Sequence, residues 1–440
     1  MTSTHHVAVF GAGYVGLTTA VCLASLGHTV ICIDNDPNII TALRAGRTHL
    51  AEPDLTTMLR DGLAAGTLHF DTDPTAATHA HIVMLCLPTP ARPDGSADLA
   101  AIHTTLTHLR HQLAPGTVIA TKSTVPVGTT DKITALLGRD DLSTVANPEF
   151  LREGHAVYDF LHPTRIVLGS HDPAAAKRIA SLYDAIRTEI ITTNPASAEL
   201  AKYAANAFLA TKLSFINSIA RLCDQLCADV TDITHILGAD QRIGGDHLQP
   251  GPGWGGPCLP KDATALAHQS KTAGVDFAVF DAAIHANTEH QQHIVNRIHD
   301  ELGGLDNTRI GVLGLTFKPG TNDHRHSPAI QIATTLVRRG AHVTARDPAA
   351  QLDDQDELEC AADPVGAAHG ADALVLLTDW PDYHTLNWTQ IAASMAGDLV
   401  FDTRNCLDPS GPRRAGLRYL GLGRYQASAS ECAANRRQRP

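Results

Sequence analysis

A chain of 440 residues is too long for one ordinary hydrophobic core, so two or three domains are expected. Its hydrophobic content of 43% and charged content of 18% are typical of a globular protein rather than a membrane-spanning one. The net charge of −12 at pH 7 argues against partners such as nucleic acid or a membrane surface, since proteins that bind either carry basic patches.

The first part of the chain alternates short apolar runs with helical patterns, which is typical of a parallel α/β sheet. A helix is predicted in "LTTAVCLASLG", ending at Gly27. Strands are predicted in "HVAVFGAG", "TVICID", "HIVMLCLP", "TVIATKSTVP", "LSTVANPE" and "TRIVLGS".

The stretch from residue 196 to residue 230 has no internal Gly or Pro and carries apolar residues on more than one face. This pattern predicts one helix, longer than a typical globular helix, that connects two domains and packs against a second subunit. A second α/β unit begins near Arg309, with strands predicted in "RIGVLGLTF", "AHVTARDP", "ADALVLLTDW" and "DLVFDTRN" and a helix ending at Gly340.

The residues Gly11, Gly13 and Gly16 form a G-x-G-x-x-G motif between the first strand and the first helix. In this context the glycines allow a tight turn, a close approach of a pyrophosphate and close packing of the helix on the strand. Asp34 stands at the end of the second strand, where a carboxylate accepts hydrogen bonds from ribose hydroxyls and repels a 2′-phosphate. The motif therefore predicts NAD rather than NADP as cofactor.

Polar side chains follow several predicted strands, where ligands of an open parallel sheet bind. Thr89, Ser123 and Thr124 are candidates for the nicotinamide end, although each of them, taken alone, fits a hydroxyl that caps a loop better. "NPEFLREG" offers Glu149 and Glu153 as candidate general bases.

One face of the long helix presents Glu199, Lys202 and Asn206. An ammonium beside an amide suits a developing oxyanion, and the alternative is a surface ion pair between Glu199 and Lys202.

The stretch "GWGGPCLPKD" places Cys258 in a rigid turn, with Lys261 and Asp262 directly behind it. Turn N–H groups and a lysine raise the thiolate fraction of a cysteine, and Asp262 is placed to hold a water or to order the lysine. A reactive thiol and a structural thiol both remain open interpretations from these residues alone.

These motifs in this order resemble the UDP-glucose/GDP-mannose dehydrogenase family, from "GAGYVG" through "STVPVG", "NPEFLREG", "ELAKYAANAFLATK", "DQRIG" and "GWGGPCLPKD" to "TFKPGTNDHRHSPA". The resemblance implies an N-terminal Rossmann NAD domain and a C-terminal Rossmann-like sugar-nucleotide domain, joined by a long central helix. We expect domains at residues 1–195, 196–300 with the cysteine loop, and 301–430, followed by a disordered tail at 431–440.

The implied activity is a four-electron oxidation of a nucleotide sugar at C6, from UDP-glucose to UDP-glucuronate, with two NAD reduced. In this scheme Cys258 forms a thiohemiacetal and then a thioester, which water hydrolyses. The alternatives keep the chemistry but act on GDP-mannose, a UDP-N-acetylhexosamine or a dTDP-hexose. Two further classes are disfavoured. A two-electron hydroxyacid dehydrogenase needs neither a nucleophilic cysteine nor a second α/β domain, and a non-catalytic NAD-binding protein does not need Cys258, Lys202 and Asp262, which are all present.

The resemblance also implies residue roles. The catalytic set is Cys258, Lys202, Asn206, Asp262, Glu153 and Thr124. The cofactor-binding set is Gly11, Gly13, Tyr14, Val15, Gly16, Asp34, Thr89, Thr124, Glu153, Lys261 and Arg325. The substrate-binding set is Phe150, Leu151, Arg152, Lys202, Asn206, Arg242, Gly251, Gly253, Trp254, Gly255, Phe317, Lys318 and Arg404. Arg242 is expected to reach the sugar site of a neighbouring subunit, which implies a homodimer or a higher homo-oligomer.

The nine cysteines, an odd number at irregular spacings, are interpreted as thiols in a reducing compartment. Together with a first strand that begins at once, without a cleavable apolar segment, they predict a cytoplasmic location. No H-E-x-x-H or paired C-x-x-C pattern occurs, so no metal is predicted.

Overall fold

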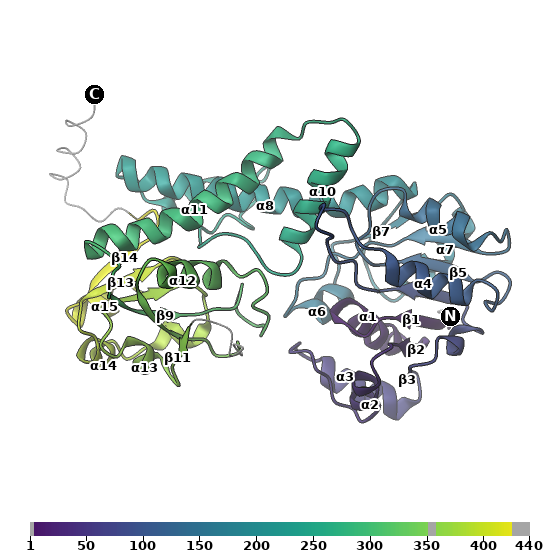
Figure 1. Cartoon of the computed structure of the whole chain (residues 1–440). Coiled ribbons are helices and arrows are strands. Elements are labelled where there is room, and N and C mark those ends of the chain that lie inside the picture. Colours follow the sequence, from purple (N-terminus) through teal and green to yellow (C-terminus); the bar gives the residue numbers. More distant parts are fainter. Residues whose placement is uncertain (1–3, 351–357, 425–440) are drawn as a thin grey trace. The chain divides into compact units, whose positions relative to one another are not determined.

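The computed structural model describes residues 4–350 and 358–424 (Figure 1). Its contacts divide the chain into two compact units. The first unit comprises Met1–Asn206 and Thr264–Val275, and the second comprises Ala207–Ala263 and Asp276–Pro440. The predicted tail at 431–440 lies outside the described residues.

The first unit is built on an eight-stranded sheet in the order β3-β2-β1-β4-β5-β6-β7-β8. The strands are β1 (His6–Phe10), β2 (Thr29–Ile33), β3 (Leu68–Asp71), β4 (Ile82–Leu85), β5 (Val118–Thr121), β6 (Ser143–Ala146), β7 (Arg165–Gly169) and β8 (Glu189–Thr193). Its helices are α1 (Tyr14–Ser25), α2 (Pro37–Arg44), α3 (Leu55–Ala65), α4 (Ala100–Leu109), α5 (Thr129–Leu137), α6 (Ala156–Leu161) and α7 (Pro173–Ala180), with short turns η1 (Pro74–Ala77) and η2 (Ser181–Tyr183).

The second unit contains a six-stranded parallel sheet in the order β11-β10-β9-β12-β13-β14. Its strands are β9 (Arg309–Leu313), β10 (His342–Arg346), β11 (Glu359–Cys360), β12 (Ala373–Leu376), β13 (Leu399–Asp402) and β14 (Arg418–Gly421). Its helices are α9 (Val230–Ala239), α11 (Ala278–Leu302), α12 (Pro328–Arg338), α13 (Pro364–Ala368), α14 (Trp388–Ser394) and α15 (Ser410–Arg414), with the turn η3 (Pro381–Thr385).

Two helices contribute residues to both units. The long helix α8 (Pro195–Leu226) spans 32 residues, which confirms the predicted long helix. Helix α10 (Leu259–Thr272) begins in the second unit and continues into the first. No helix within residues 4–350 and 358–424 has the length and the apolar character that crossing a bilayer requires.

The central strands of both sheets are buried on their two faces, as the continuous apolar runs predict. In β1, Val7 and Val9 pack in one hydrophobic cluster, whereas Ala8 and Phe10 pack in another. The same alternation holds in β12 of the second unit. Every ligand site of these sheets must therefore lie at an edge, beyond the ends of the strands.

Several helices begin at an Asp-Pro or Ser-Pro pair. The side chains of Asp36, Asp172 and Ser327 accept hydrogen bonds from first-turn N–H groups, and the proline that follows each of them occupies the first turn, where no N–H donor is needed. These pairs therefore determine where the three helices begin.

Two expectations need correction. The sheet of the first unit is mixed, because β7 pairs with β6 in the antiparallel sense and carries the parallel strand β8 with it. The cysteines are not all thiols, because Cys227 is disulfide-bonded.

Candidate functional site

The glycine loop of the first unit connects β1 to α1 and leaves room for a ligand at one position. A Cβ atom on Gly16 would lie 1.9 Å from the carbonyl oxygen of Gly11, so this position requires glycine for helix–strand packing. At Gly13, by contrast, a Cβ atom would meet no described atom within 4 Å. Gly13 is also the N-cap of α1 and makes no side-chain cap hydrogen bond, so no cap side chain fills the space at the start of this helix. Tyr14 and Val15 form the first turn.

The Asp34 carboxylate lies directly beside this loop. It accepts hydrogen bonds from the N–H of Ala12 at 2.7 Å and from the N–H of Asp36 at 3.0 Å. Each carboxylate oxygen has a second lone pair, so Asp34 can hold the loop and still accept from a ribose diol. This arrangement fits a dinucleotide with an unsubstituted ribose, as predicted.

Lys202 does not pair with Glu199, so the expected alternative of a surface pair between them is wrong. The Lys202 Nζ atom lies 2.9 Å from Oε1 of Glu149, with both side chains less than a tenth exposed. Burial by itself would raise the pKa of Glu149, but the Lys202 ammonium and the Leu151 N–H lower that pKa overall. Lys202 is therefore held as an ammonium by a buried carboxylate, one helical turn from the half-buried Asn206.

Glu199 has a positioning role that the sequence did not predict. Its carboxylate accepts hydrogen bonds from the N–H of Gly128 at 2.6 Å and from the N–H and hydroxyl of Thr130 at 2.7 and 2.6 Å. These donors form the start of α5, so Glu199 joins α8 to the loop that carries "STVPVG". Burial nevertheless raises the pKa of Glu199 above its ordinary value.

The polar loops around Lys202 enclose a small pocket within the first unit. Its lining is Thr121, Ser123, Thr124, Val125, Ala146, Pro148, Glu199 and Lys202. The hydroxyl of Thr89 donates to the carbonyl of Thr124 at 2.8 Å, and the hydroxyl of Ser123 donates to the carbonyl of Leu87 at 2.7 Å. The hydroxyls of Thr89 and Ser123 thus brace the two loops, and Thr124 lines the pocket.

The segment 147–154 leaves the carboxyl end of β6 and contains several predicted residues. The Phe150 ring lies between the Arg165 guanidinium, 3.8 Å from its centroid, and the Lys202 ammonium, 5.5 Å from it. Arg152 forms a two-pronged ion pair with Asp159 at 2.9 and 2.7 Å. Glu153 is half-buried in the turn that follows.

A second carboxylate missed by sequence reasoning, Glu52, fixes the end of this segment. It accepts hydrogen bonds from the N–H groups of Gly154, at 2.8 Å, and of Ala156 at the start of α6. Glu52 lies 102 positions away along the chain, so no local pattern could have revealed the contact.

In the second unit, the glycine-rich loop before Cys258 is packed tightly by neighbouring side chains. The N–H of Gly251 donates to Asn217, and its carbonyl oxygen lies 2.8 Å from Nε2 of His290. Asn287 bonds both the N–H and the carbonyl of Trp254 at 2.9 and 3.0 Å. Gly253 belongs to the same turn, with a φ of +125°. These contacts hold the backbone of the loop in one conformation.

Two predicted substrate residues, Phe317 and Arg404, lie against this loop, and Lys318 lies beside Phe317. The Phe317 ring lies 2.7 Å from the position of a Cβ atom on Gly256, and the Arg404 guanidinium lies 2.7 Å from that of Gly251. Arg404 donates through Nε to the carbonyl of Leu377 at 2.9 Å, and Lys318 Nζ lies 5.5 Å from the Phe317 ring centroid. A Cβ atom on Gly255 would lie 2.1 Å from the carbonyl oxygen of His326. The loop thus needs glycine at the positions where residues that follow β9 and β13 lie against it.

Cys258 is exposed and stands directly before the first residue of α10. Lys261 Nζ lies 2.9 Å from Oδ1 of Asp262, which is 2% exposed. A thiol next to a helix N-terminus lies in an environment that favours the thiolate. The structure thus places Cys258, Lys261 and Asp262 in one turn of helix.

Two predicted residues are paired elsewhere on the surface. Arg242 forms an ion pair with Asp240 at 2.6 Å and is 88% exposed. The Arg325 Nε atom lies 2.9 Å from Asp323. Their predicted contacts with a neighbouring subunit and with NAD therefore stay predictions.

The predicted site residues divide between the two units. The first unit holds the NAD loop together with Thr124, Glu153, Lys202 and Asn206. The second unit holds Cys258, Lys261, Asp262 and the substrate residues from Arg242 to Arg404.

Models of one protein family match the chain in three consecutive segments. They describe the NAD binding domain, the central domain and the UDP binding domain of the UDP-glucose/GDP-mannose dehydrogenase family, over residues 5–187, 196–289 and 311–409.

Curated relatives match over nearly the whole chain. A UDP-glucose 6-dehydrogenase of Rhizobium meliloti is 38% identical over 433 residues, covering 95% of this chain and 99% of its own. Another from Pseudomonas aeruginosa is 35% identical, covering 97% and 99%.

Solved structures agree with the fold. A UDP-glucose dehydrogenase from Pyrobaculum islandicum aligns with a TM-score of 0.88 at 34% identity, covering 96% of this chain and 98% of its own. A UDP-D-ManNAc dehydrogenase from Pyrococcus horikoshii aligns with a TM-score of 0.85 at 26% identity, covering 96% and 100%.

Proposed function

The chain belongs to the UDP-glucose/GDP-mannose dehydrogenase family, and from that premise we propose that it oxidises UDP-glucose at C6 to UDP-glucuronate. It is an NAD-dependent nucleotide-sugar dehydrogenase, as its curated relatives are. The observation that carries the covalent part of the proposal is the exposed Cys258 at the start of α10, with Lys261 and Asp262 one turn behind it.

NAD is the cofactor, and the first unit fits it. The first turn of α1 and the open space at Gly13 suit the pyrophosphate, while the Asp34 carboxylate suits the ribose diol. NAD, when bound, accepts hydride from the sugar carbon in each of two successive oxidations. Tyr14, Val15, Thr89, Lys261 and Arg325 complete the proposed set of cofactor contacts.

We assign Cys258 the nucleophilic role. Loss of hydride and a proton turns the C6 alcohol into an aldehyde, and the Cys258 thiolate then adds to its carbon. The tetrahedral adduct loses a second hydride and becomes a thioester. Water cleaves the carbon–sulfur bond, which releases the carboxylate and restores the thiol. In sum, one alcohol, one water and two NAD⁺ give one carboxylate, two NADH and three protons.

The remaining groups of the proposed reaction hold charge and protons. Lys202 is an ammonium fixed by Glu149, and with Asn206 it is suited to stabilise the alkoxide and the later oxyanions. Asp262 is proposed as the base of the first oxidation, acting through a water. Glu153 and Thr124 are proposed to position the hydrolytic water.

Binding of the sugar nucleotide is assigned mainly to the second unit. Phe317 offers a ring face, and Lys318 and Arg404 offer positive charge for a diphosphate, beside the glycine-rich loop. Gly251, Gly253, Trp254 and Gly255 supply backbone along the sugar. Phe150, Leu151 and Arg152 of the first unit, and Arg242 of a second copy, complete the proposed contacts.

A homodimer is part of the proposal. On α8 the side chains of Phe208, Phe215, Leu222 and Leu226 are between 50% and 64% exposed. Their spacing puts them along one side of the helix, which favours burial against a second copy. A cytoplasmic location also stays a prediction.

The alternative is the same chemistry on another nucleotide sugar. The likeness to a UDP-D-ManNAc dehydrogenase shows that this architecture also occurs in a protein named for an N-acetylated substrate. A panel of UDP-glucose, GDP-mannose, UDP-N-acetylmannosamine and dTDP-glucose separates the candidates. We expect turnover with UDP-glucose and two NADH per uronate formed. One NADH per sugar would contradict the four-electron reaction.

The covalent step has its own test. Cys258→Ala should abolish uronate formation while NAD affinity is kept, and Cys360→Ala, at another exposed cysteine, should leave turnover unchanged. Mass spectrometry of the quenched enzyme during turnover should find the sugar nucleotide on Cys258. Normal turnover by Cys258→Ala would exclude the thioester route.

A further inference from the structure

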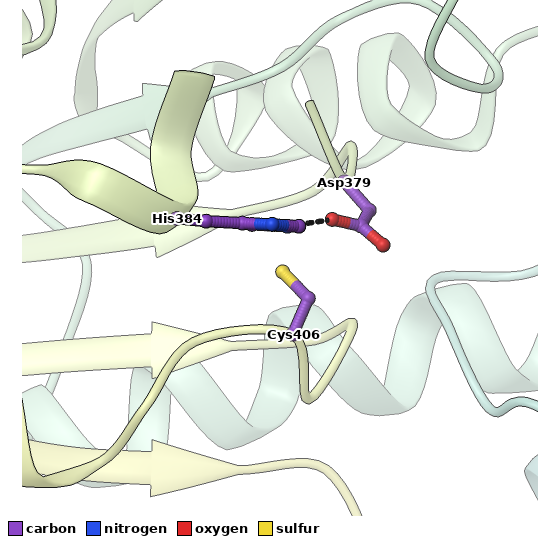
Figure 2. A group of neighbouring side chains, drawn as sticks. All are labelled: Asp379, His384 and Cys406. Carbon is purple, nitrogen blue, oxygen red and sulfur yellow. Dashed lines mark hydrogen bonds and ion pairs between the residues drawn. The ribbon is translucent and has the colours of Figure 1, made fainter. Parts of the chain in front are cut away.

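A second group of ligand-type side chains lies within the second unit, in the loops that follow β12 and β13. Asp379 follows β12, His384 lies in η3 and Cys406 follows β13 (Figure 2). One ligand atom of each residue lies within 4.8 Å of the others, and Nε2 of His384 lies 2.5 Å from Oδ1 of Asp379. Three chemically different donors, from two separate loops, thus converge on one point.

We propose that Asp379, His384 and Cys406 bind a divalent transition-metal ion, with Zn²⁺ the ion of best fit. Imidazole nitrogen, carboxylate oxygen and thiolate sulfur together form a donor set that Zn²⁺ accepts, and three protein ligands leave one tetrahedral position for water. Hard cations such as Mg²⁺ and Ca²⁺ take oxygen ligands, so this donor set disfavours them.

The observed spacing requires only a small adjustment. Zn–N and Zn–O bonds of about 2.0 Å and a Zn–S bond of about 2.3 Å put tetrahedral ligand atoms roughly 3.3–3.5 Å apart. The His384 and Asp379 atoms must therefore separate slightly from their hydrogen-bonded 2.5 Å. Their side chains are 44% and 41% exposed, which leaves both free to move by that amount.

The turn that carries the sulfur, in contrast, is held in place. The Asp402 carboxylate accepts hydrogen bonds from the N–H of Arg404 at 2.9 Å and of Leu407 at 2.8 Å, on either side of Cys406. This turn presents the half-buried thiol toward the His384–Asp379 pair (Figure 2). The Cys406 thiol thus stands on a fixed turn, whereas the His384 and Asp379 side chains can move. These three side chains can therefore come together around an ion.

The charges permit a cation at this point. A carboxylate and a thiolate together match the two positive charges of the ion. The positive charge of Arg404 opposes binding, but its guanidinium donates to the carbonyls of Leu377 at 2.9 Å and Phe317 at 3.5 Å. We therefore expect a site weaker than a closed four-ligand zinc site.

The test uses the full-length chain with Cys258→Ser as background, which removes the exposed proposed nucleophile as a competing thiol. Titration with Co²⁺ should produce a near-ultraviolet thiolate-to-cobalt absorption band that saturates at one ion per chain. Zn²⁺ should displace the Co²⁺ and remove the band. The readout does not involve turnover, so it stands or falls separately from the proposed function.

Two ligand variants and two matched controls locate the ion. Cys406→Ser should remove the band, and His384→Gln should weaken binding at least roughly tenfold, the lower bound seen when even an outer-shell partner is lost. Cys360→Ser and His369→Gln, at exposed positions of the same unit, should change neither. Tryptophan fluorescence of each variant reports folding, and the exposed His384 keeps the test valid if Cys406→Ser fails to fold.

Two outcomes would overturn the proposal. One is a titration without a thiolate band, which would mean that His384 and Asp379 form only a hydrogen-bonded pair beside an unrelated thiol. The other is a band that survives Cys406→Ser and disappears with Cys360→Ser.

Discussion

Replacing Glu149 by Gln should destabilise the first unit by about 3 kcal/mol or more, the usual cost of breaking a buried ion pair from one side. The pair has a 2.9 Å contact, and its side chains are 6% and 8% exposed, so little water reaches Lys202 once the carboxylate is gone. Lys122 is also buried, at 5% exposure. Burial lowers the pKa of Lys122, and the negative charge of Glu149 opposes that shift. The variant therefore also removes a carboxylate that favours the charged form of Lys122.

The loss of stability caused by breaking the ion pair can be distinguished from a general disruption of packing in the first unit. For a unit of this size about 3 kcal/mol corresponds to a loss of roughly 6–12 °C in the unfolding midpoint. The double variant Glu149→Gln/Lys202→Met removes both charges and should recover most of the loss, because a buried ion pair is often replaceable by apolar groups at little cost. Glu189→Gln, an exposed position of the first unit, is the matched control.

The assay uses the distribution of tryptophan. All 3 tryptophans, Trp254, Trp380 and Trp388, fall in the second unit. Their fluorescence reports that unit, whereas far-ultraviolet circular dichroism reports both. Glu149→Gln should therefore shift the dichroism transition more than the fluorescence transition. An unchanged dichroism midpoint, or a double variant that loses the sum of both single losses, would refute the reasoning.

Three further predictions concern cofactor binding and pH. Gly13→Ala should weaken NAD binding without changing the unfolding midpoint, whereas Gly16→Ala, whose Cβ would lie 1.9 Å from Gly11, should lower the midpoint as well; calorimetric titration and thermal unfolding distinguish them. Asp34→Ala should weaken NAD and relax discrimination against NADP, and an unchanged preference in steady-state kinetics would contradict the ribose contact. Burial lowers the pKa of His290 from 6.5 to about 4, against an opposing bond to a backbone carbonyl. The unfolded chain therefore takes up this proton first, and stability present above pH 6.5 falls as the pH drops toward about 4, by about 3 kcal/mol in all. In His290→Gln, fluorescence-monitored unfolding should show a shallower pH dependence over that range.

Much of the fold could be predicted because apolar runs and glycine positions are local signals. Each predicted strand segment contains a strand, and the long helix was found from the lack of Gly and Pro. The strands that were missed, β3, β8, β11 and β14, carry weak signals. β3 and β14 have only four residues each, two of them buried. β8 has no fully buried residue, and β11 has only two residues, both exposed. The antiparallel start of β7 was missed because strand direction depends on the connection rather than on composition.

The site was predictable only in its motifs. Cys258, the glycine loop and Asp34 stand in recognisable local patterns, so the sequence alone was enough to propose them as site residues. Partners were assigned less well, because Lys202 was set beside Glu199 by helical spacing, whereas the fold brings Glu149 to it from the end of β6. The metal-type cluster was also missed, because Asp379 and Cys406 meet only through adjacent strands.

Helix α8 has buried anchoring side chains in its first turns and exposed apolar side chains farther along. Glu199 and Lys202 anchor the first turns to two loops, so those turns cannot rotate without breaking both sets of bonds. Each residue inserted between Asn206 and Phe208 would turn the apolar side chains of α8 by about 100° around the helix axis, whereas seven inserted residues would nearly restore their direction. The length of this stretch of α8 therefore determines the direction in which the apolar side chains beyond it point. We expect related chains to differ in length here by two full helical turns or not at all.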